Sequence, residues 1–434
     1  MKKLLVQFKM SFIFLADLLA AFLALVLMIF IRYGGNSFYS ELRDHAFPFT
    51  VVFFLFILAF YIFNLYSFRF NRNTTEFISS FIKSIIIAFS ISVLVFYIFG
   101  DFFKLTPKTN LVLFTIFFSA FDFYLRILAK RRFVKHSINR KIVIIGGQPG
   151  GLIEELAQNQ NIGYKIIKQT AHFDLDEIIT INPDVVVIDE EKETELDKIY
   201  TLMKRNIFVY TINNFYEEIF QKVPTDQLEK TEIIDYISKN RTLFNFIKRT
   251  MDIFLSGILI LVLSPIALIL AILIKSTSQG PILFKHKRIS LNDENFTIYK
   301  FRSMYTDAEK NGAVWTKDNN RDPRITPLGR FMRNTHLDEI PQLVNIIRGD
   351  ISFVGPRPER PEFTGKLKKI ISYYDLRHAV KAGLTGWAQV NYKYGSSIED
   401  AKEKLKYDFF YIKNRSIFFD ILIILKTLAK IFAR

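Results

Sequence analysis

Cysteine is absent from this 434-residue chain, and only six histidines are present. The first absence excludes disulfides and thiolate metal sites, and the second leaves few ligands for a zinc centre. Any metal ion that the protein uses is therefore expected to be held by carboxylates and phosphates. Such oxygen ligands favour magnesium.

Acidic residues are too few to balance the basic ones. The chain has 42 Asp and Glu against 58 Lys and Arg, while half of all residues are hydrophobic and 46 are Phe. Positive charge combined with an apolar composition is typical of membrane segments separated by basic loops. The charge alone is compatible with binding to nucleic acid, anionic lipid or a polyphosphorylated substrate.

Apolar runs fill the first third of the chain, and each is close to the length of about 20 residues that crosses a bilayer as a helix. The second run is short unless residues 64–68 extend it. Basic residues before the first run and after the last place both ends of this bundle in the cytoplasm. The first run lacks a small-residue cleavage site, so we interpret it as a retained anchor. The four runs are residues 10–31, 47–63, 77–100 and 111–128 within a transmembrane domain of residues 1–132.

Asp17, Lys83 and Asp122 lie inside or beside these apolar runs. Ionisable groups are costly in a membrane and often have a function there. They can also pair with one another inside the bundle or extend to the interface without any function.

Residues 133–235 have the pattern of a soluble α/β domain. Short β-branched runs alternate with polar helical segments, which predicts a parallel, Rossmann-like sheet. The turn from Gly146 to Gly151 follows the first expected strand and can bring a phosphate to a helix N-terminus. It lacks the regular G-x-G-x-x-G spacing, so a tight turn without a ligand is the other interpretation.

Residues 236–434 form the third expected domain, which contains two further apolar segments. Residues 251–274 are long enough to span a membrane, but they contain Ser264-Pro265 and have basic residues on both flanks. Because a spanning helix would place one basic flank outside the cell, we predict a re-entrant helix that breaks at Ser264-Pro265. A kinked spanning helix is the alternative. Residues 417–432 are interrupted by charges, which fits either an interfacial helix or a core helix.

Two adjacent carboxylates, Asp338 and Glu339, lie at the start of a predicted helix that ends at Gly349. Pro341 is tolerated only in the first turn, so Asp338 is expected at or close to the N-cap. An anion is stabilised there, and a phosphate can bind nearby. The pair alone can also be an ordinary N-cap Asp and a first-turn Glu. The amphipathic spacing is that of Ile340, Leu343, Val344 and Ile347.

Basic residues are concentrated around this pair in the sequence. Arginine forks bind phosphate oxygens well, and a basic set around two carboxylates suits phosphoryl transfer. Aromatic residues do not alternate regularly with the basic ones, which disfavours nucleic acid. Any single arginine can instead belong to a solvated surface. The basic set comprises Lys300, Arg302, Arg321, Arg324, Arg330, Arg333, Arg357 and Arg360.

Ordered motifs extend from Lys248 to the C-terminus. Together they resemble the catalytic domain of the bacterial monotopic polyprenyl-phosphate phosphoglycosyl transferases. The four apolar runs and the α/β domain resemble the long-form members of that family. The motifs are Lys248-Arg249-x-x-Asp252, Ser264-Pro265, Tyr299-Lys300-Phe301-Arg302-Ser303-Met304, Asp322-Pro323-Arg324-Ile325-Thr326, Leu337-Asp338-Glu339-Ile340-Pro341-Gln342-Leu343, Gly349-Asp350-Ile351-Ser352-Phe353-Val354-Gly355-Pro356-Arg357-Pro358 and Gly383-Leu384-Thr385-Gly386-Trp387-Ala388-Gln389-Val390-Asn391.

The resemblance implies a membrane helical bundle, a Rossmann-like α/β domain and an α+β catalytic domain with a re-entrant helix. It also implies that Asp338 attacks the sugar-bearing phosphorus of a UDP-sugar and releases UMP. Undecaprenyl phosphate, or another polyprenyl phosphate, then attacks the phosphosugar-aspartyl intermediate. Glu339 is implied as an acid/base or positioning partner, and Mg²⁺ as a bridge between Asp338 and the diphosphate. The implied substrate-binding residues are Lys300, Arg302, Arg333, Arg357 and Asp408.

The implied location is the bacterial cytoplasmic membrane, with the catalytic domain on the cytoplasmic face. The expected partners are a UDP-sugar, a polyprenyl phosphate and the lipid bilayer, without nucleic acid, and a homodimer is kept open. The reaction would initiate exopolysaccharide, capsule or O-antigen synthesis. Two other functions compete with this one: a membrane glycosyltransferase that releases UDP, and a non-enzymatic nucleotide-sensing scaffold that uses the Gly146 to Gly151 turn.

Overall fold

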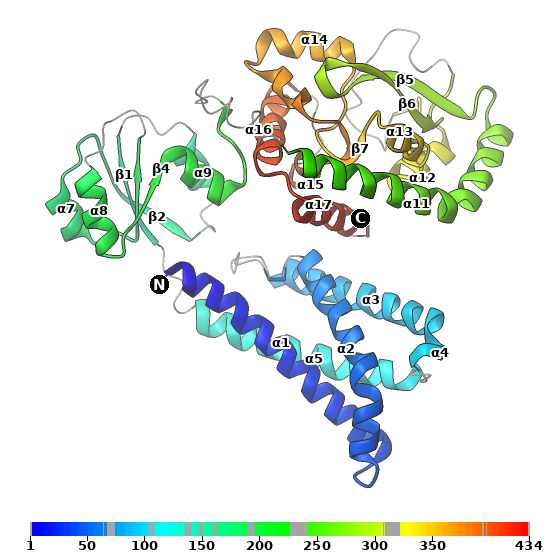
Figure 1. Cartoon of the computed structure of the whole chain (residues 1–434), viewed down its shortest axis with the longest axis horizontal. Helices are drawn as coiled ribbons and strands as arrows, with labels where there is room; N and C mark the ends of the chain where they lie inside the picture. The colour runs from blue at the N-terminus through cyan, green and yellow to red at the C-terminus, as the bar shows by residue number, and fades with distance from the viewer. Residues whose placement is uncertain are drawn as a thin grey trace. The chain divides into compact units, whose positions relative to one another are not determined.

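The chain divides into two compact units, Met1–Phe215 and Tyr216–Arg434, whose elements are labelled in Figure 1. The expected boundary between residues 235 and 236 lies outside the described residues. The computed structural model describes residues 2–63, 65–66, 74–103, 108–134, 140–146, 151–158, 163–189, 196–225, 241–306, 308, 322–392, 395 and 397–432.

Long helices form a bundle in the first unit. Each contains a stretch that, by length and composition, could cross a membrane. The expected helices are thereby confirmed, and the second starts at Phe38, before the expected run, and ends at Ile62. The bundle comprises α1 (Lys2–Tyr33), α2 (Phe38–Ile62), α3 (Thr74–Ile98) and α5 (Lys108–Val134), with the single turn α4 (Gly100–Phe103) between α3 and α5.

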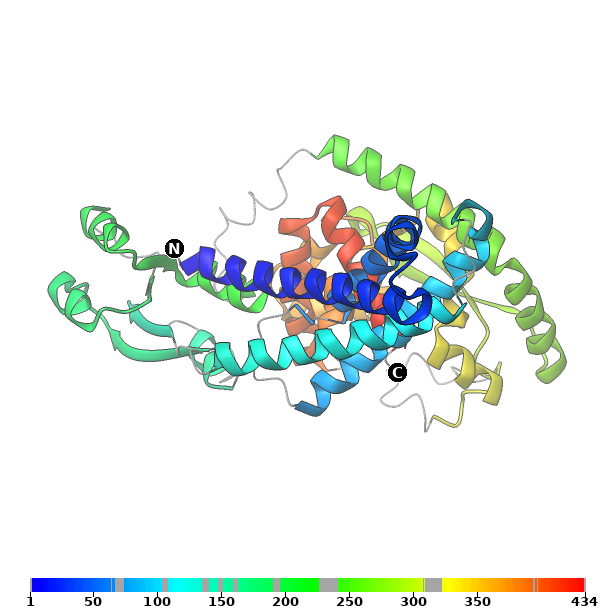
Figure 2. The same ribbon diagram turned by 90° about the horizontal axis from the view of Figure 1, so that it is seen from below.

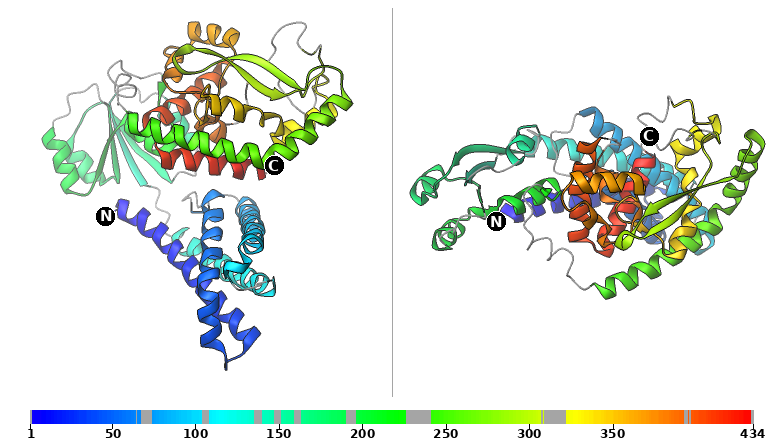
Figure 3. Two further views of the ribbon diagram at one scale, coloured as in Figure 1. Left: turned by 45° about the vertical axis from the view of Figure 1, so that its right-hand side comes forward. Right: turned by 90° about the horizontal axis from the view of Figure 1, so that it is seen from above.

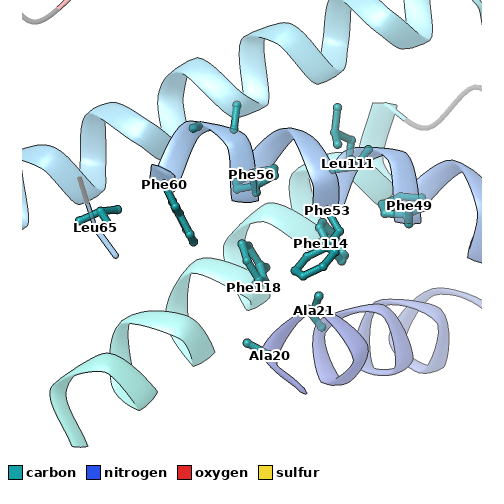
Figure 4. Close-up of a cluster of buried hydrophobic side chains, with 14 of the residues drawn as sticks. Ala20, Ala21, Phe49, Phe53, Phe56, Phe60, Leu65, Leu111, Phe114 and Phe118 are labelled. Atoms are coloured by element: carbon teal, nitrogen blue, oxygen red, sulfur yellow. The ribbon is translucent and has the colours of Figure 1, made fainter. Parts of the chain in front are cut away.

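Phenylalanine rings fill the core of this bundle, as Figure 4 shows for α2 and α5. Phe114 and Phe118 on α5 stack with their ring centroids 5.7 Å apart. Phe118 also stacks on Phe60 of α2. The facing side chain on α1 is the small Ala20, which is fully buried. Small residues let helices approach closely where lipid gives no hydrophobic drive for association.

Asp17, Asp122 and Arg126 form a buried ionic cluster in the bundle. The Arg126 guanidinium donates to both carboxylate oxygens of Asp17 at 2.9 Å and to Asp122 at 2.7 Å. It also donates to the Leu65 carbonyl at 3.0 Å. Pairing inside the bundle is therefore confirmed for Asp17 and Asp122, and it joins α1, α5 and the end of α2.

The rest of the first unit contains a parallel sheet with strand order β2-β1-β3-β4. The central strand β3 is buried at every position, which is typical of a parallel sheet covered on both faces. The expected alternation of strands and helices is confirmed. Residues 147–150 of the glycine turn lie outside the described part of the chain, and ligand binding by this domain stays a prediction. The elements are β1 (Arg140–Ile145), α6 (Leu152–Gln158), β2 (Tyr164–Thr170), α7 (Leu175–Ile181), β3 (Val185–Ile188), α8 (Leu196–Lys204), β4 (Phe208–Thr211) and α9 (Ile212–Phe220).

The second unit mixes helices with two small sheets around a core that contains Trp387, Ile346 and Phe409. The antiparallel β5–β6 hairpin lies beside α14 (Figure 3). The elements after α9 are α11 (Thr242–Thr277), β5 (Leu283–Ile289), η3 (Leu291–Asp293), β6 (Asn295–Phe301), α12 (Pro327–Thr335), η4 (Leu337–Glu339), α13 (Gln342–Arg348), β7 (Ser352–Val354), α14 (Pro361–Ile370), η5 (Tyr374–Ala379), β8 (Gly383–Thr385), α15 (Trp387–Asn391), α16 (Ile398–Asn414) and α17 (Ile417–Phe432).

Helix α11 is continuous over 36 residues, including Pro265. The break that we expected at Ser264-Pro265 is therefore absent, and the helix extends beyond residues 251–274 at both ends. Figure 2 shows that it changes direction along its length. Proline removes one hydrogen bond of the helix, which bends an otherwise apolar helix without ending it.

The C-terminal helix α17 directs its charged residues inward. Asp420 is buried and pairs with Lys248, Lys426 lies over the Trp387 ring, and Lys430 donates to the Gln389 carbonyl at 2.8 Å. Among the apolar residues, Ile423 is buried in the core, whereas Phe418 is 86% exposed. One apolar face thus packs on the protein and another is exposed, which fits the interfacial interpretation.

Candidate active site

The turn that carries the two carboxylates joins two helices. Helix α12 ends at His336, which has the left-handed φ of 57°. The 3₁₀ turn η4 then presents Asp338 and Glu339 before α13 begins, with Pro341 as its N-cap. Asp338 thus lies close to the helix start, as expected, but it is not the N-cap itself, because the carboxylates occupy a separate turn before Pro341. Gly349 ends α13 with φ 91°, as predicted.

Glu339 is held by two cations. Lys300 at the end of β6 donates to its Oε1 atom at 2.6 Å, and Arg357 approaches the same oxygen at 3.4 Å. Burial raises the pKa of Glu339, but the charges of Lys300 and Arg357 outweigh burial and hold the pKa well below its usual range. Glu339 is therefore an anion in this arrangement and fixes the positions of both cations.

Asp338 has a different environment, since its side chain is only 7% exposed. Burial is the largest influence and raises its pKa to about 6, and the negative charge of Glu339 adds to this effect. Lys300, Arg333 and Arg357 oppose the rise. The surrounding cations thus keep a buried carboxylate ionised near neutral pH, which is the state required of a nucleophile.

Two of the other predicted substrate residues lie on neighbouring segments. Arg333 on α12 donates from Nε to the Ser303 hydroxyl at 2.8 Å. Arg302 is buried, and its guanidinium donates to the Ser278 carbonyl at 2.8 Å and hydroxyl at 2.7 Å. Arg302, which directly follows β6, therefore connects this strand to the end of α11 through these hydrogen bonds. The structure groups Lys300, Arg333 and Arg357 around the carboxylates, and their contact with substrate stays a prediction.

Asp408, the last predicted substrate residue, is buried in α16 with 2% exposure. Its carboxylate lies 2.8 Å from the Arg377 guanidinium, and burial raises its pKa to about 6 against the opposing charge of Arg377. Arg377 also donates to the Arg357 carbonyl at 3.1 Å and to the Tyr374 hydroxyl at 2.6 Å. Asp408 thus connects to the carboxylate turn through Arg377 and the Arg357 backbone.

The Lys248-Arg249-x-x-Asp252 motif connects the start of α11 to this region, a role that sequence reasoning missed. Arg249 donates to the carbonyls of Ile346 and Ile347 at the end of α13, at 2.6 and 2.5 Å. Asp252 accepts from the Phe353 amide at 3.2 Å. Polar residues spaced three apart at the start of an apolar helix were the available signal, since they mark a face that meets protein instead of lipid.

Asn345 on α13 is a second residue that sequence reasoning missed. Its amide is buried and bonds to the backbone of β6, the strand that carries Lys300. No periodicity distinguishes it, because a single Asn in a helix is ordinarily a surface residue.

The described residues contain no group of three or more side chains suited to hold a metal ion. Mg²⁺ is often bound by one or two carboxylates together with substrate phosphates. Because Glu339 is already paired with Lys300 and Arg357, Asp338 is the carboxylate available for such a site. The single carboxylate of Asp338 fits a Mg²⁺ site only when a phosphate ligand supplies further oxygen atoms.

Comparison with known proteins agrees with the motifs. The model of the bacterial sugar transferase family matches residues 243–434. The UDP-N-acetylgalactosamine-undecaprenyl-phosphate N-acetylgalactosaminephosphotransferase of Aeromonas hydrophila is 38% identical over 226 residues, which are 52% of this chain and 52% of the relative. The UDP-glucose:undecaprenyl-phosphate glucose-1-phosphate transferase of Escherichia coli (strain K12) is 35% identical over 231 residues, which are 53% of this chain and 48% of the relative.

The chain thus spans about half the length of these two curated relatives. A shorter relative is covered almost entirely. The exopolysaccharide production protein PSS of Rhizobium leguminosarum bv. phaseoli is 41% identical over 187 residues, which are 42% of this chain and 92% of the relative. With this identity over nearly the whole relative, and with the family match over residues 243–434, which include Asp338 and Glu339, the chain belongs to the bacterial sugar transferase family.

Proposed function

We propose that this protein transfers a sugar 1-phosphate from a UDP-sugar to undecaprenyl phosphate, through a covalent intermediate on Asp338. The observation that carries the proposal is a buried carboxylate with a pKa of about 6, surrounded by Lys300, Arg333 and Arg357. The family membership and the named reactions of two relatives support the same reaction class.

In the first half-reaction, a carboxylate oxygen of Asp338 attacks the sugar-bearing phosphorus. An acyl phosphate bond forms, the bond from this phosphorus to the bridging oxygen breaks, and UMP leaves with that oxygen and its electron pair. Charge accumulates on the phosphate oxygens, where Arg333 and Arg357 can bind them. In the second half-reaction, a phosphate oxygen of undecaprenyl phosphate attacks the same phosphorus and releases the Asp338 carboxylate.

Glu339 acts as a positioning residue in this scheme. Its pKa is held well below the usual range by Lys300 and Arg357, so it does not carry a proton to donate near neutral pH. It instead holds both cations beside the nucleophile. Of the two roles implied by the resemblance, the structure thus favours positioning over acid/base catalysis.

Mg²⁺ is proposed as the cofactor, held by Asp338 together with the substrate diphosphate. When bound, it would neutralise charge on the diphosphate and make the sugar-bearing phosphorus more electrophilic. The chain itself supplies Lys300, Arg333 and Arg357 for the remaining negative charge.

Helix α11 is proposed to enter the cytoplasmic leaflet and return. Near its start, Arg249 and Asp252 contact α13 and β7. Near its end, Leu270 and Ile274 pack against Phe301 and Met332 of the same unit. A spanning helix would place these two ends on opposite sides of a hydrocarbon core of about 30 Å. Contacts of both ends with one domain support the re-entrant path, and the basic residues on both flanks of the apolar segment support a cytoplasmic location of that domain.

The products of the first half-reaction test the proposal. Purified protein in lipid nanodiscs is incubated with undecaprenyl phosphate, Mg²⁺ and a panel of UDP-sugars, and the released nucleotide is identified. We expect UMP, and Asp338→Asn should abolish its release. Release of UDP would instead identify a glycosyltransferase. If the wild-type protein releases no nucleotide but binds one, and changes in the Gly146 to Gly151 turn abolish this binding while Asp338→Asn does not, the scaffold alternative is favoured.

A further inference from the structure

The side chain of Asn345 is completely buried in α13, with 0% exposure, and every hydrogen-bonding group of its amide has a partner. The Oδ1 atom accepts from the Tyr299 amide at 3.0 Å. The Nδ2 atom donates to the Thr297 carbonyl at 2.7 Å and to the Asp350 carboxylate at 2.8 Å. An Asn amide has two N–H groups, and both are used here.

Two of these bonds have the geometry of a sheet partner. The Thr297 carbonyl and the Tyr299 amide come from alternate residues of β6. Both form hydrogen bonds with the Asn345 side chain. The other edge of β6 is paired with β5. Asn345 therefore completes the hydrogen bonding of β6 where no third strand is paired with it in the described sheet. Because an unpaired buried backbone group is costly, the strand cannot slide along α13 without losing these bonds.

The residue next to Tyr299 is Lys300, which donates to Glu339 at 2.6 Å. Helix α13, for its part, begins directly after the turn with Asp338 and Glu339. Asn345 thus connects the strand that carries the cation to the helix that follows the carboxylates. A second contact between the two, from Arg348 to the Tyr299 hydroxyl at 2.8 Å, is exposed and can exchange with water.

We propose that Asn345 is a positioning residue that fixes Lys300 beside the Asp338–Glu339 turn. It does not touch substrate and acts on the reaction only through Lys300. This inference rests on the proposed function, because the effect of Lys300 is read from the rate of UMP release. Lys300 bonds to Glu339 in the carboxylate turn, so its displacement should lower kcat/KM for UMP release as its removal does.

The test compares kcat/KM for UMP release, together with the melting temperature, in four full-length proteins in nanodiscs: wild type, Asn345→Ala, Lys300→Met and the double variant. We expect Asn345→Ala to lower kcat/KM by about tenfold, because Lys300 is displaced from the carboxylate turn. In the Lys300→Met background, Asn345→Ala should add no further loss of kcat/KM, since the residue it positions is already absent.

Ser290→Ala is the matched control. Ser290 is buried in the same unit, donates to the Asp350 carbonyl at 2.7 Å and accepts from the Ala382 amide at 3.2 Å. Its removal also breaks two buried hydrogen bonds but touches neither β6 nor Lys300 in these contacts. We expect reduced thermal stability with kcat/KM at the wild-type value. Asn345→Ser, which keeps one hydroxyl donor, provides a milder variant if Asn345→Ala does not fold.

Two results would overturn the inference. One is a wild-type kcat/KM in the Asn345 variants at reduced thermal stability, which would make the residue purely structural. The other is a further loss of kcat/KM in the double variant beyond that of Lys300→Met. Both differ from failure of the proposed function, in which the wild-type protein itself releases no UMP.

Discussion

Replacement of Lys300 by Met should change the pH profile more than the maximal rate. The ammonium group lies 2.6 Å from Glu339, in a partly buried pair whose side chains are 19% and 15% exposed. Unit charges about 4 Å apart interact by about 4 kcal/mol at an effective dielectric constant of about 20. Because Lys300 bonds directly to Glu339 and not to Asp338, we assign about a third of this energy to the interaction of Lys300 with Asp338. This energy corresponds to about one unit in the pKa of Asp338.

The pKa of Asp338 is raised by burial to about 6, so its reactive carboxylate form predominates above that pH and is lost below it. In Lys300→Met the pKa should rise to about 7. The ionised fraction then falls about fivefold at pH 6, about twofold at pH 7 and by only about a tenth at pH 8. The pKa of Asp338 rises because loss of a nearby cation favours the protonated, neutral form of the carboxyl group.

The assay is UMP release by full-length protein in nanodiscs, with kcat/KM measured from about pH 5 to about pH 9. If Lys300 acts only on ionisation, the variant recovers almost fully by pH 8. A loss that persists at high pH measures the additional contact of Lys300 with substrate phosphate. An acid limb that stays at the wild-type position, or moves downward, would refute the electrostatic reasoning. Lys285→Met changes a Lys on the paired strand β5 and serves as the control for surface charge.

Three further changes have defined outcomes. Asp408→Asn leaves the buried, charged Arg377 without a carboxylate partner, so we expect the free energy of unfolding to fall by about 3 kcal/mol and kcat to decrease. An increased KM with unchanged stability would instead indicate that Asp408 contacts the substrate. Arg126→Met should lower the melting temperature of the protein in detergent, because Asp17 and Asp122 lose their shared partner. Neutralising both carboxylates in this variant should restore the melting temperature. An unchanged melting temperature in Arg126→Met would contradict a stabilising role of the ionic cluster. Chelation with EDTA should abolish UMP release and Mg²⁺ should restore it, whereas full activity in EDTA would exclude the proposed cofactor.

Local sequence patterns predicted much of the fold. The strands of the α/β domain were predictable because β-branched runs bounded by polar segments pair well in a covered parallel sheet. The end of α13 was predictable because Gly349 accepts the left-handed φ that terminates a helix. Asp338 and Glu339 were predicted to be catalytic only because of the surrounding motifs, since the pair alone also fits an ordinary helix start.

The interactions that position the site were less accessible to sequence reasoning. The start of α13 was misplaced because Pro341 becomes its N-cap and leaves Asp338 in a separate 3₁₀ turn. Arg249 contacts carbonyls almost a hundred residues away along the chain, and only tertiary packing brings them together. Asp408 matched a substrate-binding position, but its burial is set by how α16 packs and not by its neighbours in sequence.

The covalent step at Asp338 is tested most directly by intact-protein mass spectrometry with UDP-sugar and Mg²⁺ in the absence of any polyprenyl phosphate. We expect a burst of UMP and a mass increase of one sugar phosphate, mapped to the peptide that contains Asp338 and removed by undecaprenyl phosphate. Asp338→Asn should show neither. UMP release that begins only after undecaprenyl phosphate is added, with no adduct on the protein, would contradict the covalent mechanism.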